Sequence, residues 1–269
     1  MQKNWRFIIS GKFPPATNMA IDESILEGVI KGRSPQTVRV YDWDPPTVSL
    51  GFHQKIASQI DIEKVKKYGF GIVRRPTGGR AVLHYDEVTY SVIARTDDRF
   101  RGNVIESYKQ IAHILSIALR TIGIQVDIEK GMKEEQRANN WSAPCFSSAS
   151  KYEIHYQGKK LVGSAQMRRE GCFLQHGSIL FNHDQSIMAE FVPHIDTRKL
   201  EHLRTLLAQK TIAINQILNP HISFLHFAIV LKRCFEEELK MPFYLGSSLT
   251  NFEYNQFRNI LPRYDEKFF

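Results

Sequence analysis

Residues 74–84, which read RRPTGGRAVLH, place cations, a proline and paired glycines between two short hydrophobic runs. The runs at 70–73 and 88–93 are rich in β-branched or aromatic residues, which predicts two strands and a connecting loop. Paired glycines let a backbone adopt positive φ and come within contact distance of a ligand. Amide N–H groups in such a loop, with three arginines nearby, could hold an acyl carbonyl or a phosphate. An ordinary hairpin turn is an equally good interpretation of the same residues.

The sequence lacks the two common phosphate-binding fingerprints. Neither Gly-x-x-x-x-Gly-Lys-Ser/Thr nor Gly-x-Gly-x-x-Gly occurs. The net charge of +8 still predicts an anionic partner, which could be a nucleic acid, a phosphate-bearing cofactor or an acidic protein. The basic residues are spread along the chain without a block of five, which weakens the nucleic-acid interpretation.

The chain has no apolar run near the roughly 18 residues that a membrane span needs. Its early apolar run, at 7–9, is too short for the core of a signal peptide. We therefore expect a soluble, cytoplasmic protein. A length of 269 residues favours one large domain and leaves room for a small appendage.

Three cysteines occur at wide spacings, without a Cys-x-x-Cys pair, so the sequence predicts neither a disulfide framework nor a zinc site. Cys172 lies in a predicted strand and Cys234 in a predicted amphipathic helix, and for both we expect packing roles. Cys145 follows a proline in a loop, where a thiol can be exposed at a cleft rim, although its local context slightly favours a structural role. A nucleophilic cysteine needs a nearby cation, and Lys160 is the natural candidate because a hairpin turn could return it toward Cys145.

Hydrophobic periodicity places further strands in the first half and the middle of the chain, and helices mainly toward its end. Strands are expected at 5–9, 38–41, 47–51, 152–156, 161–168 and 172–181. Helices are expected at 17–30, 61–68, 104–119, 185–191, 198–209 and 224–239. The last three strands read as an antiparallel meander. Strands grouped together with flanking helices favour an α+β fold over a doubly wound parallel sheet.

Two polar residues in the predicted helices invite a functional interpretation. Asp22 and its neighbour Glu23 cannot share one helix face, so paired-carboxylate catalysis is not expected and a solvated or capping role is. His113 lies within the helix at 104–119, where a structural role is expected.

Several motifs together resemble one protein family. The segments 74–84, 158–166 (GKKLVGSAQ) and 175–180 (QHGSIL) resemble the three signatures of the biotin/lipoate protein ligase superfamily, in the family's order. Residues 18–23 (NMAIDE) also match. Residues 144–146 (PCF) stand where LipM-type octanoyltransferases carry their acyl-accepting cysteine. The resemblance covers nearly the whole chain, and its motifs are specific only in combination.

The resemblance implies a fold and a reaction. The fold is an α+β catalytic domain with a mixed, largely antiparallel β-sheet flanked by helices. It would span residues 1–269, with its core at about 33–248 and a short helical C-terminal segment from about 212. The reaction is octanoyl transfer from acyl carrier protein, through a cysteine thioester, to a lysine of a lipoyl domain, typically the glycine cleavage H protein. It implies no cofactor, no metal, no nucleic acid and no membrane.

The resemblance also implies roles for individual residues. Cys145 would be the nucleophile, and Lys160 would lower its pKa and orient the thioester carbonyl. The residues expected to line the acyl site are Arg75, Gly78, Gly79, His84, Ser164 and His176.

Four other functions are compatible with parts of this sequence. A second class of octanoyltransferase carries its cysteine after the His-Gly strand, but residues 191–194 (FVPH) contain none, which disfavours that class. An ATP-dependent lipoate ligase needs no cysteine and commonly has an accessory domain, for which the tail after about residue 212 is too short. A lipoyl/octanoyl amidotransferase also uses a cysteine in this vicinity. The non-enzyme alternative is a basic anion- or nucleic-acid-binding protein without a reactive thiol.

Overall fold

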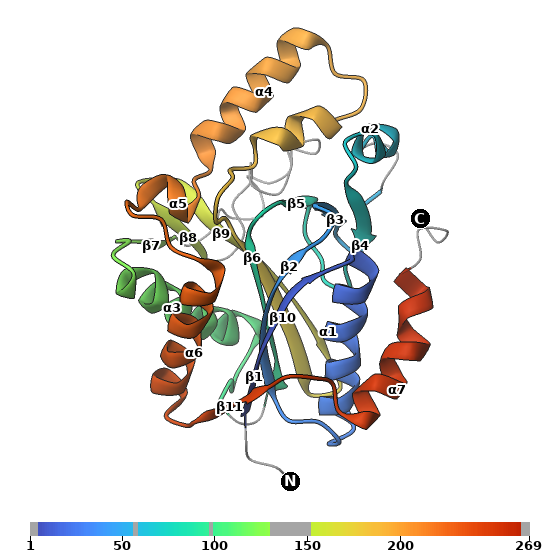
Figure 1. The fold of residues 1–269 in the computed structure, drawn as a ribbon, viewed down its shortest axis with the longest axis vertical. Coiled ribbons are helices and arrows are strands. Elements are labelled where there is room, and N and C mark those ends of the chain that lie inside the picture. The colour runs from blue at the N-terminus through green and yellow to red at the C-terminus, as the bar shows by residue number, and fades with distance from the viewer. Residues whose placement is uncertain (1–4, 56–58, 97–98, 130–151, 265–269) are drawn as a thin grey trace.

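The computed structural model describes residues 5–55, 59–96, 99–129 and 152–264, and within them the strands form two sheets. The larger has eight strands in the order β11-β1-β2-β6-β10-β9-β8-β7 (Figure 1). Its strands are β1 (Trp5–Phe13), β2 (Thr37–Trp43), β6 (Val88–Arg95), β7 (Asp127–Glu129), β8 (Glu153–Tyr156), β9 (Lys159–Arg169), β10 (Cys172–Ile179) and β11 (Phe243–Gly246).

The large sheet is mixed, as the family resemblance implies. From β8 through β9, β10 and β6 to β2 every pairing is antiparallel, and the predicted meander is its central part. Strand β1 instead runs parallel to both β2 and β11. The expected α+β class is therefore confirmed.

The smaller sheet carries the glycine motif. It consists of β3 (Thr47–Leu50) between β4 (Gly71–Arg74), which is parallel to it, and β5 (Val82–His84), which is antiparallel. The connection at 75–81, here called the Arg–Gly–Gly loop, thus crosses the end of β3, where the Arg75 N–H donates to the Leu50 carbonyl. The hairpin interpretation is wrong, because β4 and β5 lie on opposite sides of β3 and do not pair with each other.

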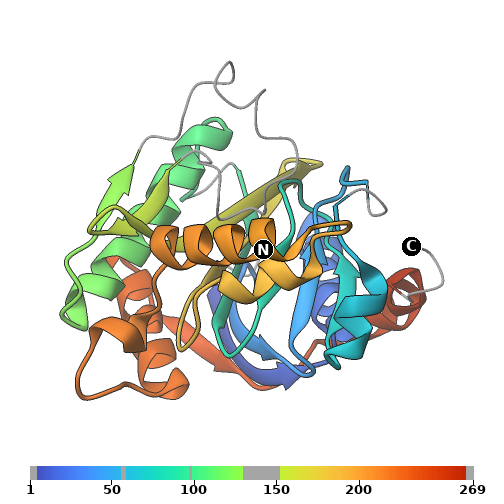
Figure 2. The same cartoon turned by 90° about the horizontal axis from the view of Figure 1, so that it is seen from above.

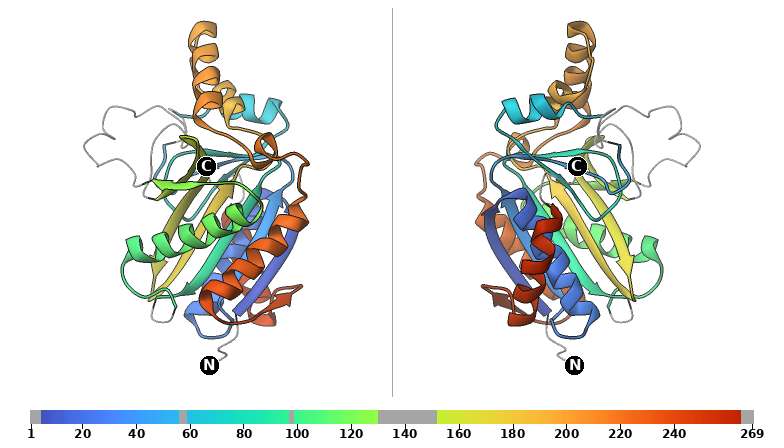
Figure 3. Two further views of the ribbon diagram at one scale, coloured as in Figure 1. Left: turned by 90° about the vertical axis from the view of Figure 1, so that its left-hand side faces the viewer. Right: turned by 90° about the vertical axis from the view of Figure 1, so that its right-hand side faces the viewer.

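Helices cover both faces of the large sheet. In Figure 3, α1 (Pro15–Ile30) and α7 (Asn251–Ile260) lie on one face, and α3 (Val104–Thr121) and α6 (Phe224–Leu239) on the other. Seen from above in Figure 2, α4 (Thr197–Lys210) lies across the top of the molecule. The remaining helices are α2 (Ile62–Lys67), α5 (Ile214–Ile217) and the 3₁₀ helices η3 (Ser186–Phe191) and η4 (Leu261–Tyr264).

Local sequence explains how helices α1 and α3 begin. Pro15 occupies the first turn of α1, where its missing N–H has no intrahelical acceptor to lose. Asn103 and Glu106 form a reciprocal capping box at the start of α3. In the described part of the chain, no helix is long and apolar enough to cross a membrane.

A buried ion pair joins the two ends of the chain. Arg6 on β1 donates to Glu253 on α7 at 2.5 Å, and both side chains are buried. Cys172 and Cys234 are also buried, as their predicted packing roles require.

Candidate active site

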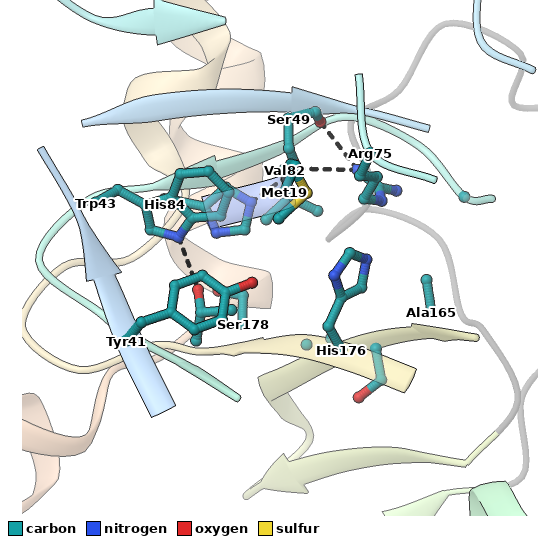
Figure 4. Close-up of a pocket in the computed structure, with 15 residues that line it drawn as sticks. Met19, Tyr41, Trp43, Ser49, Arg75, Val82, His84, Ala165, His176 and Ser178 are labelled. Atoms are coloured by element: carbon teal, nitrogen blue, oxygen red, sulfur yellow. Dashed lines mark hydrogen bonds between the residues drawn. The ribbon is translucent and has the colours of Figure 1, made fainter. Parts of the chain in front are cut away.

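A pocket lies where the Arg–Gly–Gly loop and the small sheet meet the α1 face of the large sheet (Figure 4). Most of its wall is apolar or aromatic, with a few polar groups, which is typical of a small-molecule site. The lining residues are Met19, Tyr41, Trp43, Ser49, Arg75, Gly79, Val82, His84, Thr89, Gly163, Ser164, Ala165, His176, Gly177 and Ser178.

Arg75 holds the loop in shape through its guanidinium group. One nitrogen donates to the carbonyl and hydroxyl oxygens of Ser49 at 2.9 and 3.0 Å. The other donates to the carbonyls of Gly78 and Arg80 at 2.9 and 2.7 Å. The Gly78 C=O and the Gly79 N–H belong to the same trans peptide and therefore point in opposite directions. Because the Gly78 oxygen accepts from Arg75, the Gly79 N–H points away from Arg75.

Gly79 and Gly51 are required by the backbone geometry of the loop. Gly79 has φ of +97°, which side-chain-bearing residues rarely adopt. A Cβ on Gly51 would lie 1.9 Å from the Gly79 oxygen, so the end of β3 and the loop touch backbone to backbone. Within the described residues, the N–H groups of Gly78 and Gly79 have no hydrogen-bond acceptor. They are therefore available to a ligand oxygen.

His84 is bonded at both ring nitrogens. Its Nε2 lies 2.7 Å from the Ser49 hydroxyl and its Nδ1 lies 2.7 Å from the Glu87 carboxyl group, while the ring stacks on Trp43. The arrangement of Ser49, His84 and Glu87 resembles a nucleophile–histidine–acid triad. Burial, aided by the Arg75 charge, lowers the pKa of His84 to about 3, which makes it a very weak base at neutral pH. His84 therefore orients Ser49, and through Ser49 it supports Arg75.

His176 points from β10 toward the loop (Figure 4). Its Nε2 lies 2.6 Å from the Thr77 hydroxyl, and its Nδ1 lies 3.8 Å from an oxygen of Asp22. Burial lowers the pKa of His176, although the Asp22 charge opposes this shift.

Asp22 was missed by the sequence analysis, and its expected solvated or capping role is wrong. The carboxylate is fully buried and accepts hydrogen bonds from Arg39 and Tyr41 at 2.9 Å and from Ser91 at 3.0 Å. Burial opposes its ionisation, but the charge of Arg39 and the nearby His176 ring outweigh burial and lower its pKa. The Arg39 partner on β2 is distant in sequence, and the segment 18–23 alone carries no sign of it.

Ser164 borders the pocket, but its hydroxyl lies on the other face of the sheet. Ser164, Gly177 and Tyr90 form one cross-strand row, adjacent to the row of His176. Because neighbouring residues of a strand point to opposite faces, Ser164 and His176 lie on opposite sides. The Ser164 hydroxyl is hydrogen-bonded to Tyr90 at 2.7 Å across Gly177.

Lys160 is buried and donates to Glu153 at 2.6 Å. Its neighbour Lys159 is partly exposed, as strand alternation predicts. Lys160 and Gly78 are not among the lining residues of the pocket, whereas Arg75, Gly79, His84, Ser164 and His176 are. Cys145 lies outside the described residues.

The family model and the similar sequences point to the same protein family. The model of the lipoyl protein ligase A/B catalytic domain matches residues 14–236. The octanoyltransferase LipM of Anoxybacillus flavithermus is 42% identical over 241 residues, which cover 88% of this chain and 87% of the relative. The octanoyltransferase LipM of Bacillus subtilis is 37% identical over 246 residues, covering 90% and 88%.

Solved structures show the same fold at low identity. A lipoate-protein ligase A bound with ATP superimposes with a TM-score of 0.77 at 21% identity, covering 97% of this chain and 95% of its own. A bipartite lipoate protein ligase from Thermoplasma acidophilum, described together with its E2 lipoyl domain, gives 0.81 at 20% identity, covering 98% and 95%.

Proposed function

The chain belongs to the lipoyl protein ligase A/B catalytic-domain family and, within it, to the LipM octanoyltransferases, and from this premise we propose that it moves octanoyl from an acyl carrier protein to a lysine of a lipoyl domain. The observation that carries the proposal is the apolar pocket whose lining includes Gly79, a loop residue with an N–H that has no acceptor among the described residues. An acyl chain needs apolar walls, and its carbonyl needs donors where negative charge develops.

The transfer runs in two half-reactions. The Cys145 thiolate attacks the thioester carbonyl of the donor, a C–S bond to Cys145 forms, and the carrier leaves as its thiolate. The lysine amine then attacks the enzyme thioester, an amide forms as the C–S bond to Cys145 breaks, and the departing sulfur takes up the proton that the amine loses. Because the donor thioester is already activated, neither step needs a nucleotide.

Lys160 and the loop glycines would stabilise these steps. The Lys160 ammonium, held in place by Glu153, stabilises the Cys145 thiolate. The free N–H groups of Gly78 and Gly79 donate to the carbonyl oxygen as it becomes an oxyanion, where one donor is typically worth on the order of 3 kcal/mol.

Two observations support the proposed partners. The net charge of +8 suits acidic carrier and lipoyl domains, since opposite charge speeds their encounter. The Thermoplasma relative of similar fold is described with an E2 lipoyl domain. For this chain, the glycine cleavage H protein is the proposed acceptor.

Three donors tested in parallel distinguish the related reactions. Octanoyl-acyl carrier protein without nucleotide or magnesium should modify the H protein lysine, whereas free octanoate with ATP should not. If octanoate and ATP alone supported modification, the chain would be a ligase. If octanoylated H protein were the only effective donor, it would be an amidotransferase.

A further inference from the structure

A second pocket, of about 280 Å³, adjoins the active-site pocket, and Arg75 lines both of them. Three segments that are distant in the sequence form it: α1, the ends of β3 and β4 with the loops that follow them, and η4. Helix η4 lies beyond residues 14–236, the part of the chain that the family model matches. The second pocket is open to solvent, since the Arg263 side chain at its edge is 63% exposed.

Positive charge predominates in the second pocket. Among the described residues that line it, three are arginines and only one is a carboxylate. That carboxylate, Glu23, accepts a hydrogen bond from the Tyr264 hydroxyl at 2.6 Å and lies 3.6 Å from the Arg263 guanidinium. The single negative charge is thus engaged by η4, and the excess of positive charge favours an anionic ligand.

Arg74 and Arg263 have hydrogen-bond donors left for such a ligand. One terminal nitrogen of Arg74 donates to three backbone carbonyls, which fixes the side chain. Within the described residues, the other two nitrogens of Arg74 have no acceptor. In the same part of the chain, the only contact of Arg263 with an acid is the 3.6 Å pairing with Glu23, which is too long for a hydrogen bond. A guanidinium group donates in a planar fork that matches the oxygens of a phosphate.

Phe52 and Pro76 give the same pocket an apolar side. Phe52 is 55% exposed, which is unusual for a large aromatic side chain in the absence of a ligand or partner. The prosthetic arm of an acyl carrier protein combines the two kinds of chemistry that this pocket offers. Its phosphate is separated by a methylene group from a carbon that bears two methyl groups, and its far end carries the acyl thioester.

We propose that the second pocket binds the phosphate of the donor's prosthetic arm, with Arg74 and Arg263 as hydrogen-bond donors and with Phe52 and Pro76 against the neighbouring methyl groups. The inference rests on the proposed function, in which the donor is an acyl carrier protein. Because Arg75 lines both pockets, an arm held by its phosphate in one can deliver its thioester to the other. No covalent bond changes at the phosphate.

Binding of the arm can be measured without turnover. In an NMR titration, 4′-phosphopantetheine should bind wild-type protein about tenfold more tightly than pantetheine, which lacks the phosphate. Arg263→Gln should remove most of this difference, and Arg263→Lys should restore part of it, because lysine keeps the charge without the planar fork. Arg258→Gln is the matched control and should keep the full difference, because Arg258 is exposed on α7 and does not line the pocket.

Kinetics with three donors separate the arm from the rest of the carrier. In Arg263→Gln, kcat/KM should fall about fivefold or more for octanoyl-acyl carrier protein and for octanoyl-4′-phosphopantetheine, and it should not change for octanoyl-pantetheine. A fall for the intact carrier alone would place Arg263 against the carrier's protein surface and overturn the phosphate site.

Equal binding of the two arms by wild-type protein would also overturn the phosphate site, while leaving the proposed function intact. If no donor transferred its acyl group to the wild-type protein, the proposed function would fail, and the titration would still decide whether the pocket binds the phosphate.

Discussion

Lys160 on β9 and Glu153 on β8 form a buried ion pair with a 2.6 Å hydrogen bond. Removal of one partner from a buried ion pair typically costs about 3–5 kcal/mol. The pair therefore has a structural role in addition to the catalytic role proposed for Lys160, and the two must be separated by experiment.

Lys160→Ala should slow formation of the acyl-enzyme by about a hundredfold or more, because the thiolate and the oxyanion lose a cation. Lys159→Ala is the matched control on the partly exposed side of the strand and should be nearly silent. Single-turnover acylation should be measured under conditions in which urea unfolding shows each variant folded. Equal, mild effects of alanine at both positions would show that Lys160 is not a catalytic residue.

The fold should lose stability as pH falls below 6.5, because His84 has a pKa of about 3 when folded. Between pH 6.5 and 3 His84 binds a proton in the unfolded chain but not in the folded one. The free energy of unfolding is therefore highest above pH 6.5, and below it falls by up to about 1.4 kcal/mol per pH unit. His176, whose pKa is also lowered, contributes in the same direction. Urea unfolding of His84→Gln, repeated at several pH values in this range, should show an unfolding free energy that depends less steeply on pH than that of wild type. An unchanged pH dependence of the unfolding free energy would show that His84 is not buried in its neutral form.

Gly177→Ala should destabilise the protein by about 1–3 kcal/mol or more, as overpacking in a core does. A Cβ there would lie 2.6 Å from the Gly163 oxygen and from the Tyr90 ring. Gly78→Ala is the control for stability alone, because a Cβ at Gly78 meets no atom within 4 Å and its φ is not positive. Equal thermal midpoints for the two variants would contradict the tight packing of Tyr90, Gly177 and Ser164.

The kcat/KM for octanoyl-acyl carrier protein should fall as salt rises toward about 0.15 M, where the Debye length is about 8 Å. The reason is the attraction between a chain of net charge +8 and an acidic carrier. A neutral thioester such as octanoyl-N-acetylcysteamine is the control and should show little dependence. A kcat/KM for the carrier that does not change with salt would remove this role of the charge.

The sequence predicts those parts of the fold whose signals are local. Helix α3 has a continuous apolar period and a capping box, and the meander from β8 to β10 has short turns, so both were predicted within a few residues. Strand β11 and helix α7 were missed, because they are fixed by distant partners on β1, as in the pair of Arg6 and Glu253.

The same limit applies to the site. Arg75, Gly79, His84 and His176 lie in recognisable motifs, and the structure brings them to one pocket. The surroundings of Asp22 are formed by Arg39 and His176. The buried ammonium of Lys160 is likewise paired with Glu153. Such pairings exist only after β2, β8, β9 and β10 have assembled, so no local pattern could show them.

Intact mass spectrometry after mixing with octanoyl-acyl carrier protein, without ATP, tests the two-step transfer most directly. Wild-type protein should gain one octanoyl group, peptide mapping should place it on Cys145, and Cys145→Ala should gain none while keeping its fold. An unmodified wild-type protein, or a thioester on Cys172 or Cys234, would contradict the proposed reaction.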